Sequence, residues 1–344
     1  MTEQLTSATL AELISLTRRF GTLLNVGVPI RQALLAVADD ASPAFRGMLQ
    51  QAEAHVAQQG TLAGALEPFP DIVPVIYREW VRLGEDTGTL DVGALEIAEL
   101  LSPLATGGGD LALGWERIES AISLIQFTRR FADLLEKGLE WWRILVLLDY
   151  ESPPRFAHII RELLPKRDDP RAWYGLWQIM EQYPETFSPF YRAVVRLGWE
   201  ARAMDETMRN LADLLIEDWT LSRSNRCYHD RASLIIDHGA APIATWAELT
   251  LAQQSLTTIL FCRAGSQLLA SGHQRTEALA VAALLLPQDK RETLLAGLTE
   301  DCDLAQLLRE LACFPATVTT LIAAGQLSGR IEYAFNRAAE MLVP

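Results

Sequence analysis

Three carboxylates lie within one seven-residue stretch of the segment GEDTGTLD, which begins at Gly84: Glu85, Asp86 and Asp91. Carboxylate oxygens suit a hard divalent cation, but their spacing here does not match a calcium-binding loop. Two interpretations stay open. In the first, the turn is structural, and Glu85 is solvated or caps a helix. In the second, the three carboxylates present an acidic surface to a basic protein partner or to a cation.

The histidines and cysteines, which could also do chemistry, are scattered. They are His55, His158, His229, His238, His273, Cys227, Cys262, Cys302 and Cys313. No two cysteines form a C-x-x-C pair, and no histidine lies near a motif. The nucleophile context G-x-S-x-G is absent, as are the phosphate loop G-x-x-x-x-G-K-[ST] and the fingerprint G-x-G-x-x-G. The sequence therefore predicts no catalytic site, no cofactor and no metal centre, and we expect a protein that is not an enzyme.

The overall charge points to protein partners. The chain has 344 residues and a net charge of −14. Nucleic-acid binding depends on basic side chains, whereas an acidic chain suits a basic protein partner. No apolar run approaches the roughly 20 residues that a membrane span needs, and the polar residues 1–11 are not typical of a signal peptide. We therefore expect a cytoplasmic protein without nucleic-acid partners.

One sequence block occurs three times. It reads LTRRFGTLLNVG at 16–27, FTRRFADLLEKG at 127–138 and FCRAGSQLLASG at 261–272. The spacing of the apolar residues predicts a helix, which a left-handed glycine would end. The shared arginines and final glycines are Arg18, Arg129, Arg263, Gly27, Gly138 and Gly272. We expect each arginine to pair with an acidic residue of its own module, and a contact between modules is the alternative.

After the first of these blocks, Pro29 can begin a second helix, because a proline in the first turn loses no hydrogen bond. A second block follows each copy of the first, at 81–101, 195–215 and 322–342. Its shared glycines are Gly84, Gly198 and Gly325. We expect these glycines to let the last two helices of each module approach closely, and Gly88 to close the turn between them.

The two blocks predict an all-α chain of three tandem, diverged antiparallel bundles, each with about five or six helices. No sustained two-residue alternation of the strand type occurs. The predicted boundaries are 13–104 for module 1, 105–123 for a linker, 124–220 for module 2, 221–256 for a helical linker and 257–342 for module 3. The second linker is expected to hold helices around 232–237 and 244–255.

Module 1 resembles the cytoplasmic module of the type II secretion system F family, the platform proteins of type II secretion and type IV pilus assembly. The resemblance rests on the helix 20–27 that ends in glycine, on Val-Pro-Ile at 28–30, and on the Gly-Glu-x-x-Gly-x-Leu turn at 84–90. Module 2 reads GWEARAM at this turn and lacks its second glycine, and module 3 has Gln326 in place of the glutamate.

The resemblance implies a helical bundle and a scaffold that contacts an assembly ATPase, other platform components or sister copies, without a cofactor. Family proteins normally have two modules and about three membrane helices, so membrane anchoring is not implied for this chain. A position at the periphery of the inner membrane, held through partners, stays open. Because the acidic pair Glu85 and Asp86 is absent from the other two copies, we expect the partner to dock near this turn.

Two other functions stay open. The chain could be a helical-repeat interaction protein unrelated to secretion, or a small-ligand binder or enzyme whose site forms between modules. The adjacent Trp141 and Trp142 are expected to pack in a core, with a partner-binding patch as the alternative. If both are helical, they point about 100° apart, so one of them can be exposed.

Overall fold

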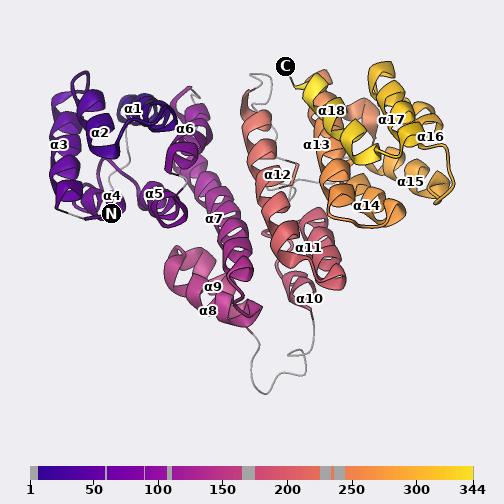
Figure 1. The fold of residues 1–344 in the computed structure, drawn as a ribbon, viewed down its shortest axis with the longest axis horizontal. Coiled ribbons are helices and arrows are strands. Elements are labelled where there is room, and N and C mark those ends of the chain that lie inside the picture. Colours follow the sequence, from indigo (N-terminus) through magenta and orange to yellow (C-terminus); the bar gives the residue numbers. More distant parts are fainter. Residues whose placement is uncertain are drawn as a thin grey trace. The chain divides into compact units, whose positions relative to one another are not determined.

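The computed structural model describes residues 7–58, 60–88, 90–106, 111–164, 175–224, 234–235 and 245–343. Within these ranges the chain forms eighteen α-helices and short 3-10 helices, without a strand (Figure 1). The all-α prediction is confirmed. The chain divides into two compact units, Met1–Gln126 and Phe127–Pro344, and each is described by itself.

In the first unit, α1 lies against α6, and α2 packs on α3. The short α4 contacts α3 and α5, and α5 returns to α6. The bounds are α1 Ser7–Asn25, α2 Ile30–Ala38, α3 Pro43–Ala57, α4 Leu62–Leu66, α5 Val75–Thr87 and α6 Leu90–Thr106. The side chains of Phe45, Trp80 and Ile97 are fully buried between these helices. Helix α7 (Leu111–Glu136) begins in this unit and ends in the second.

The second unit continues with α8 Trp141–Glu151, α9 Pro154–Leu163, α10 Leu176–Met180, α11 Pro189–Ala201, α12 Met204–Ser224, η2 Trp246–Glu248, α13 Leu251–Ala270, α14 Arg275–Ala282, η3 Ala283–Leu285, α15 Gln288–Gly297, α16 Leu304–Glu310, α17 Ala316–Ser328 and α18 Ile331–Leu342. In it, α11 packs on α12, and α13 packs on α18. Helix α12 also contacts α13, so the segments predicted as modules 2 and 3 belong to one compact unit.

The glycines at the ends of α1, α7 and α13 adopt the left-handed conformation: φ is +85° at Gly27, +81° at Gly138 and +80° at Gly272. The Gly27 amide donates to Leu24 O, and the next amide donates to Leu23 O, which is the Schellman arrangement. The helices fall into three runs of six, α1–α6, α7–α12 and α13–α18. The three-module organisation itself stays a prediction.

Two helices begin earlier than the sequence predicted. Helix α7 starts at Leu111, inside the segment 105–123 that was expected to be a linker, and α13 starts at Leu251 rather than near 257. Thr250 fixes the start of α13 through a capping box, in which its hydroxyl accepts from Gln253 N and the Gln253 side chain accepts from Thr250 N. This Thr-x-x-Gln signal is visible in the sequence.

The helices expected in the second linker are only partly described. Leu234 and Ile235 form a turn, and the rest of 232–237 lies outside the described residues. The helix expected over 244–255 is wrong as a separate element, because residues 246–248 form a 3-10 turn and 251–255 already belong to α13.

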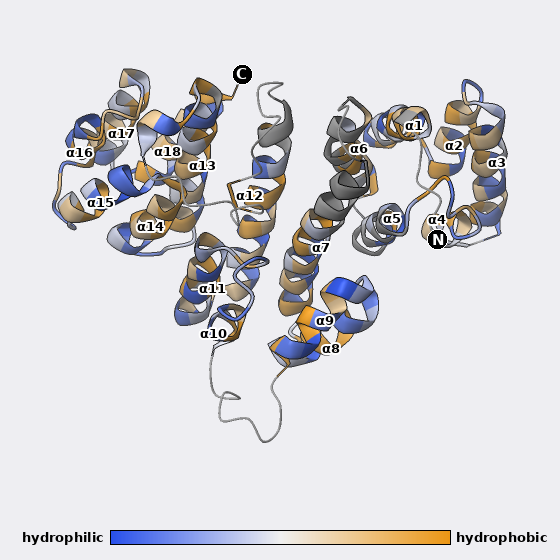
Figure 2. Cartoon of the chain, turned by 180° about the vertical axis from the view of Figure 1, so that it is seen from behind, coloured by the Kyte–Doolittle hydropathy of each residue, from blue (hydrophilic) through white to orange (hydrophobic). Residues whose placement is uncertain are grey.

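The described helices carry hydrophilic and hydrophobic residues together, as the coloured parts of Figure 2 show. No helix in the described part of the chain combines the length and the apolar composition that crossing a membrane requires.

Candidate functional site

The turn between α5 and α6 is built around two glycines. Gly88 ends α5 with φ +70°, and Gly84 is buried against the first residue of α6. A Cβ atom added at Gly84 would lie 2.9 Å from Leu90 Cα. The Trp80 indole donates to Gly93 O at 2.7 Å, so α5 and α6 are held together along this contact. Thr89, the residue before α6, lies outside the described residues.

Glu85 caps the N-terminus of α4. Its two carboxylate oxygens accept hydrogen bonds from Leu62 N at 2.5 Å and from Ala63 N at 2.9 Å. Thr61 Oγ1 accepts from Gly64 N at 3.1 Å. These amides have no partner inside the helix, and a negative charge is favourable beside them. Glu85 therefore fixes α4 to α5, as the structural interpretation of the turn expects.

Gln326 occupies the corresponding position in α17. Its side-chain oxygen accepts from Leu304 N at 3.1 Å, and its amide group donates to Cys302 O at 2.9 Å. A neutral amide thus serves the first turn of α16 in the way that Glu85 serves α4.

In α11 the same position holds Trp199, whose ring makes an edge contact with Trp141 at a centroid distance of 5.7 Å. Helix α10 is capped locally instead, since Gly175 N donates to Gln178 Oε1 at 2.9 Å. The glycine missing from this turn is replaced by Arg202, which adopts φ +57°. The turn therefore keeps its left-handed residue at some steric cost.

Of the other two predicted docking residues, Asp91 lies in the first turn of α6 and is half-buried. The side chain of Asp86 lies outside the described residues. Both oxygens of Glu85 are bonded to α4. Asp86 and Asp91 are therefore the acidic residues of this turn that stay candidates for docking a partner.

Gly198 and Gly325 lie at close helix contacts as Gly84 does. A Cβ atom added at Gly198 would lie 2.8 Å from Thr207 Cβ, and one added at Gly325 would lie 3.0 Å from Arg330 O and closer still to Ala334 Cβ. Each contact joins the fifth helix of a run of six to its sixth helix.

The three repeated arginines have different partners. Arg18 donates to Ser102 Oγ at 3.4 Å, and Arg129 lies 3.8 Å from Asp213 Oδ1, so both contact the last helix of their own run. Arg263 likewise donates to Asn336 of α18, the last helix of its own run, and in addition pairs with Glu217 of α12 at 3.0 Å. Because Glu217 lies in the predicted module 2, this pair is a contact between modules. Burial raises the pKa of Glu217, and the Arg263 charge opposes that rise.

Sequence reasoning missed the second arginine of the TRRF blocks. Arg19 pairs with Asp40 at 2.6 Å, and Arg130 pairs with Glu151 at 3.2 Å. An acidic residue stands 21 positions after the arginine in both copies, which is a signal that the sequence contains. Each pair ties the first helix of its run to the end of the second.

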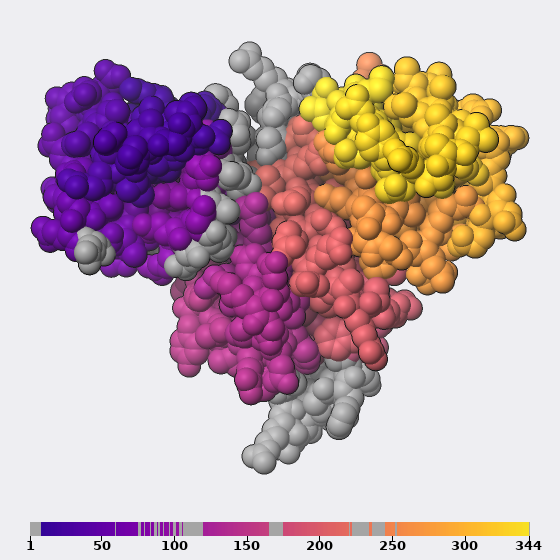
Figure 3. All heavy atoms as spheres, in the orientation of Figure 1, coloured from indigo at the N-terminus to yellow at the C-terminus, as the bar shows by residue number. Residues whose placement is uncertain are grey.

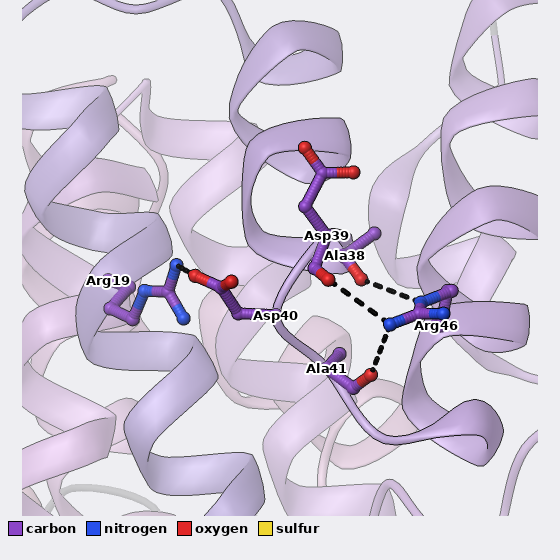
Figure 4. A network of polar contacts seen from close by, with 6 residues as sticks. All are labelled: Arg19, Ala38, Asp39, Asp40, Ala41 and Arg46. Atoms are coloured by element: carbon purple, nitrogen blue, oxygen red, sulfur yellow. Dashed lines mark hydrogen bonds and ion pairs between the residues drawn. The ribbon is translucent and has the colours of Figure 1, made fainter.

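Arg46 of α3 stabilises the connection between α2 and α3 in the first unit (Figure 4). Its guanidinium group donates to the carbonyl oxygens of Ala38, Asp39 and Ala41, each at 3.1 Å. These carbonyls lie at the end of α2, where the backbone has no helical partners, and a cation is favourable there. The corner between α2 and α3 is therefore fixed by charge as well as by packing.

A small cavity lies in the core of the first unit. Its volume is about 40 Å³, and Leu16, Val73, Thr17 and Tyr77 are among the residues that line it. Thr17 donates to Leu13 O, so Tyr77 is the donor of the 2.8 Å bond between the two hydroxyls. Burial raises the pKa of Tyr77 to about 12. Ligand sites are about ten times larger, so this cavity is a packing gap.

A comparison of the three sequence copies explains this gap. Leu16 and Val73 each stand eleven positions before a glycine of the repeated blocks, and the other two copies have phenylalanine at both places. There the rings meet, with centroids 6.2 Å apart for Phe127 and Phe187 and 5.1 Å apart for Phe261 and Phe314. The aliphatic pair of the first unit is smaller than two rings.

Within the described residues, no group of three or more His, Cys, Asp or Glu side chains is placed to hold a metal ion. Of the two adjacent tryptophans, Trp141 packs on Trp199 and Trp142 is 41% exposed.

Residues 16–102 match the family described as Type II secretion system (T2SS), protein F. The chain is 23% identical to Type II secretion system protein F of Aeromonas hydrophila, in an alignment that covers 97% of this chain and 76% of that protein. It is 35% identical over 81 residues to the protein of the same name from Vibrio cholerae, and 31% identical over 81 residues to Type IV pilus assembly protein PilC of Myxococcus xanthus. These two shorter alignments cover 20% and 19% of the relatives.

Proposed function

We propose that this chain, whose residues 16–102 match the type II secretion system F family, is a non-enzymatic scaffold of a secretion or pilus assembly machine. It works through protein–protein contacts. The observation that carries this proposal is the alignment of nearly the whole chain with a type II secretion system protein F. We place the protein in the cytoplasm or, through its partners, at the periphery of the inner membrane.

The partner that we propose is a basic surface of an assembly ATPase or of another platform component, docked at the turn between α5 and α6. Glu85 is engaged by the amides of α4, so Asp86 and Asp91 are assigned the contact. The net charge of −14 favours a basic partner. Charge complementarity of this kind mainly sets the association rate and its dependence on salt.

The test is a binding titration with the purified assembly ATPase of the same cell, at two salt concentrations. The variant Asp86→Asn/Asp91→Asn is expected to bind several-fold more weakly and to show a flatter dependence on salt. Glu85→Gln should bind like the wild type, because Gln326 shows that an amide can cap the facing helix.

The matched control is Asp39→Asn/Asp71→Asn, which removes two charges from exposed positions of the same unit. It is expected to leave the affinity unchanged. Equal affinity and equal salt dependence of the Asp86/Asp91 variant and the wild type would overturn docking at this turn.

A further inference from the structure

The second and third runs of helices meet where the start of α12 lies beside the end of α13. Ser271, the residue that follows α13, accepts a hydrogen bond from the Asn210 side chain at 3.0 Å and donates one to Glu206 Oε1 at 3.2 Å. In Figure 3, atoms of the second run, coloured salmon, lie directly against atoms of the third run, coloured orange. We call the following residues the joint between the two runs: Glu206, Asn210, Ser271, His273 and Glu277.

His273 stands where the other two copies have an apolar residue. It follows the left-handed Gly272, and its amide donates to Leu268 O at 3.2 Å, as in a Schellman helix end, which an apolar contact usually accompanies. The residues at the same place in the first and second copies are Val28 and Leu139. Both are half-buried, whereas His273 is 8% exposed. The third copy therefore has a titratable ring at the most buried of the three positions.

The buried ring of His273 is suited to the neutral state. Its Nε2 atom is buried and has no hydrogen-bond partner in the part of the chain that the structure describes. In a neutral ring one nitrogen carries a hydrogen and the other only a lone pair, whereas in a protonated ring both nitrogens are donors. A buried donor without an acceptor is unfavourable. The joint therefore accommodates the neutral ring more readily than the charged one.

The charges around the ring act against burial but do not outweigh it. Glu277 of α14 and Glu206 of α12 each raise the pKa of His273, and burial lowers this pKa by more, so that it lies below its ordinary value. Helix α13 has one charged residue, Arg263, which lies ten positions earlier and pairs with Glu217. The two carboxylates are therefore the charged groups that face the ring from the helices of the joint.

The direction of the pH dependence follows from this lowered pKa. A solvated histidine takes up its proton near pH 6.5, whereas His273 in the closed joint takes it up at a lower pH. Between these two values the open form binds the proton more readily than the closed form, so acid favours the open form. The joint is therefore at full strength above about pH 6.5 and weakens as the pH falls from there through the pKa of the buried ring.

We propose that the joint is a pH-sensitive connection between the second and third runs, which is closed while His273 is neutral and opens when the ring takes up a proton. Opening breaks the hydrogen bonds of Ser271 to α12 and lets the third run move relative to the second. The proposal concerns the second unit alone, so it does not depend on the partner assigned to the turn of the first unit.

Hydrogen exchange of the full chain at about pH 7.5 and about pH 5.5, on either side of the ordinary histidine pKa, tests the proposal. Protection factors are corrected for the intrinsic exchange rate at each pH. The amides of Ser271, Gly272 and His273 donate to carbonyls of α13, and their protection should fall several-fold at the lower pH. The equivalent amides of residues 26–28, at the end of α1, should keep theirs. Unchanged protection at 271–273 would overturn the proposal.

Two leucine variants separate His273 from the other titratable groups. His273→Leu introduces the residue of the second copy and should keep its protection at both pH values. His158→Leu makes the same change at an exposed histidine of the same unit and should lose protection as the wild type does. Glu217 and the other acidic groups are common to all three proteins. A His273→Leu variant that loses as much protection as the wild type would overturn the proposal.

A measurement on the wild type serves if His273→Leu does not fold. The imidazole Cε1 proton of each histidine reports its own titration by NMR, and single histidine variants assign the signals. The His273 signal should titrate below about pH 6.5, the ordinary value for histidine. Titration of His273 at or above that value would contradict the proposal.

Discussion

Glu85 shows how the role of one residue depends on what faces it. Its charge, its neighbour Asp86 and its glycine-bounded turn make it a candidate for docking, yet both of its oxygens are bonded to the amides of Leu62 and Ala63. Gln326 makes the equivalent contact without a charge. In the first and third runs this position therefore supplies an acceptor for the amides of the facing helix, whereas Trp199 in α11 does not. The charge of Glu85 adds the attraction to the helix dipole.

Replacing Glu85 by alanine is expected to lower the free energy of unfolding of the first unit by about 1–2 kcal/mol, because two amides lose their acceptor. Glu85→Gln should lose less, since its oxygen can still accept one bond. Thermal unfolding measures both variants, and hydrogen exchange at Leu62 and Ala63 reports the cap directly. Unchanged exchange at these two amides in Glu85→Ala would contradict the capping role.

At the scale of helices, the glycine pattern and the family resemblance were predictable from sequence, and the resemblance is confirmed. The left-handed φ at Gly27, Gly138 and Gly272 is a local property, and local signals are readable in a single chain.

The partner of Glu85 was not predictable, because the amides it meets lie more than 20 residues earlier. The contact of Arg263 with Glu217 depends likewise on how α12 meets α13. The start of α13 was not predicted, although the capping-box pattern Thr250-x-x-Gln253 indicates it.

Gly84 should tolerate no side chain, because a Cβ atom there would lie 2.9 Å from the backbone of Leu90. Gly84→Leu is expected to push α5 from α6 and to cost about 1–3 kcal/mol. Gly47→Leu is the matched control, since a Cβ atom at this glycine of α3 meets nothing within 4 Å and leucine favours the helix. An unchanged midpoint of thermal unfolding in Gly84→Leu would argue against close packing at this position.

The whole molecule combines a family domain with more helices than that domain contains. The family match ends at residue 102, whereas eighteen helices are described up to Leu342. The contact between α12 and α13 joins the second and third runs of six helices into one compact unit.

The net charge of −14 disfavours direct binding to an anionic membrane surface, so the proposed position at the inner membrane would depend on protein partners. In cell fractionation, any part of this protein found with the inner membrane is therefore expected to be released by high salt or alkaline carbonate without detergent. A protein that stays in the membrane pellet until detergent is added would contradict this location.

The gap beside Leu16 and Val73 should make the first unit sensitive to hydrostatic pressure. Unfolding by heat or denaturant does not measure this effect separately. Unfolding lets water fill internal voids, so the unfolded chain occupies less volume than the folded one, and hydrostatic pressure favours it. The void of about 40 Å³ adds to that volume difference. Hydrostatic pressure therefore destabilises this bundle, because Leu16 and Val73 leave a gap where each of the other two copies has two phenylalanine rings in contact.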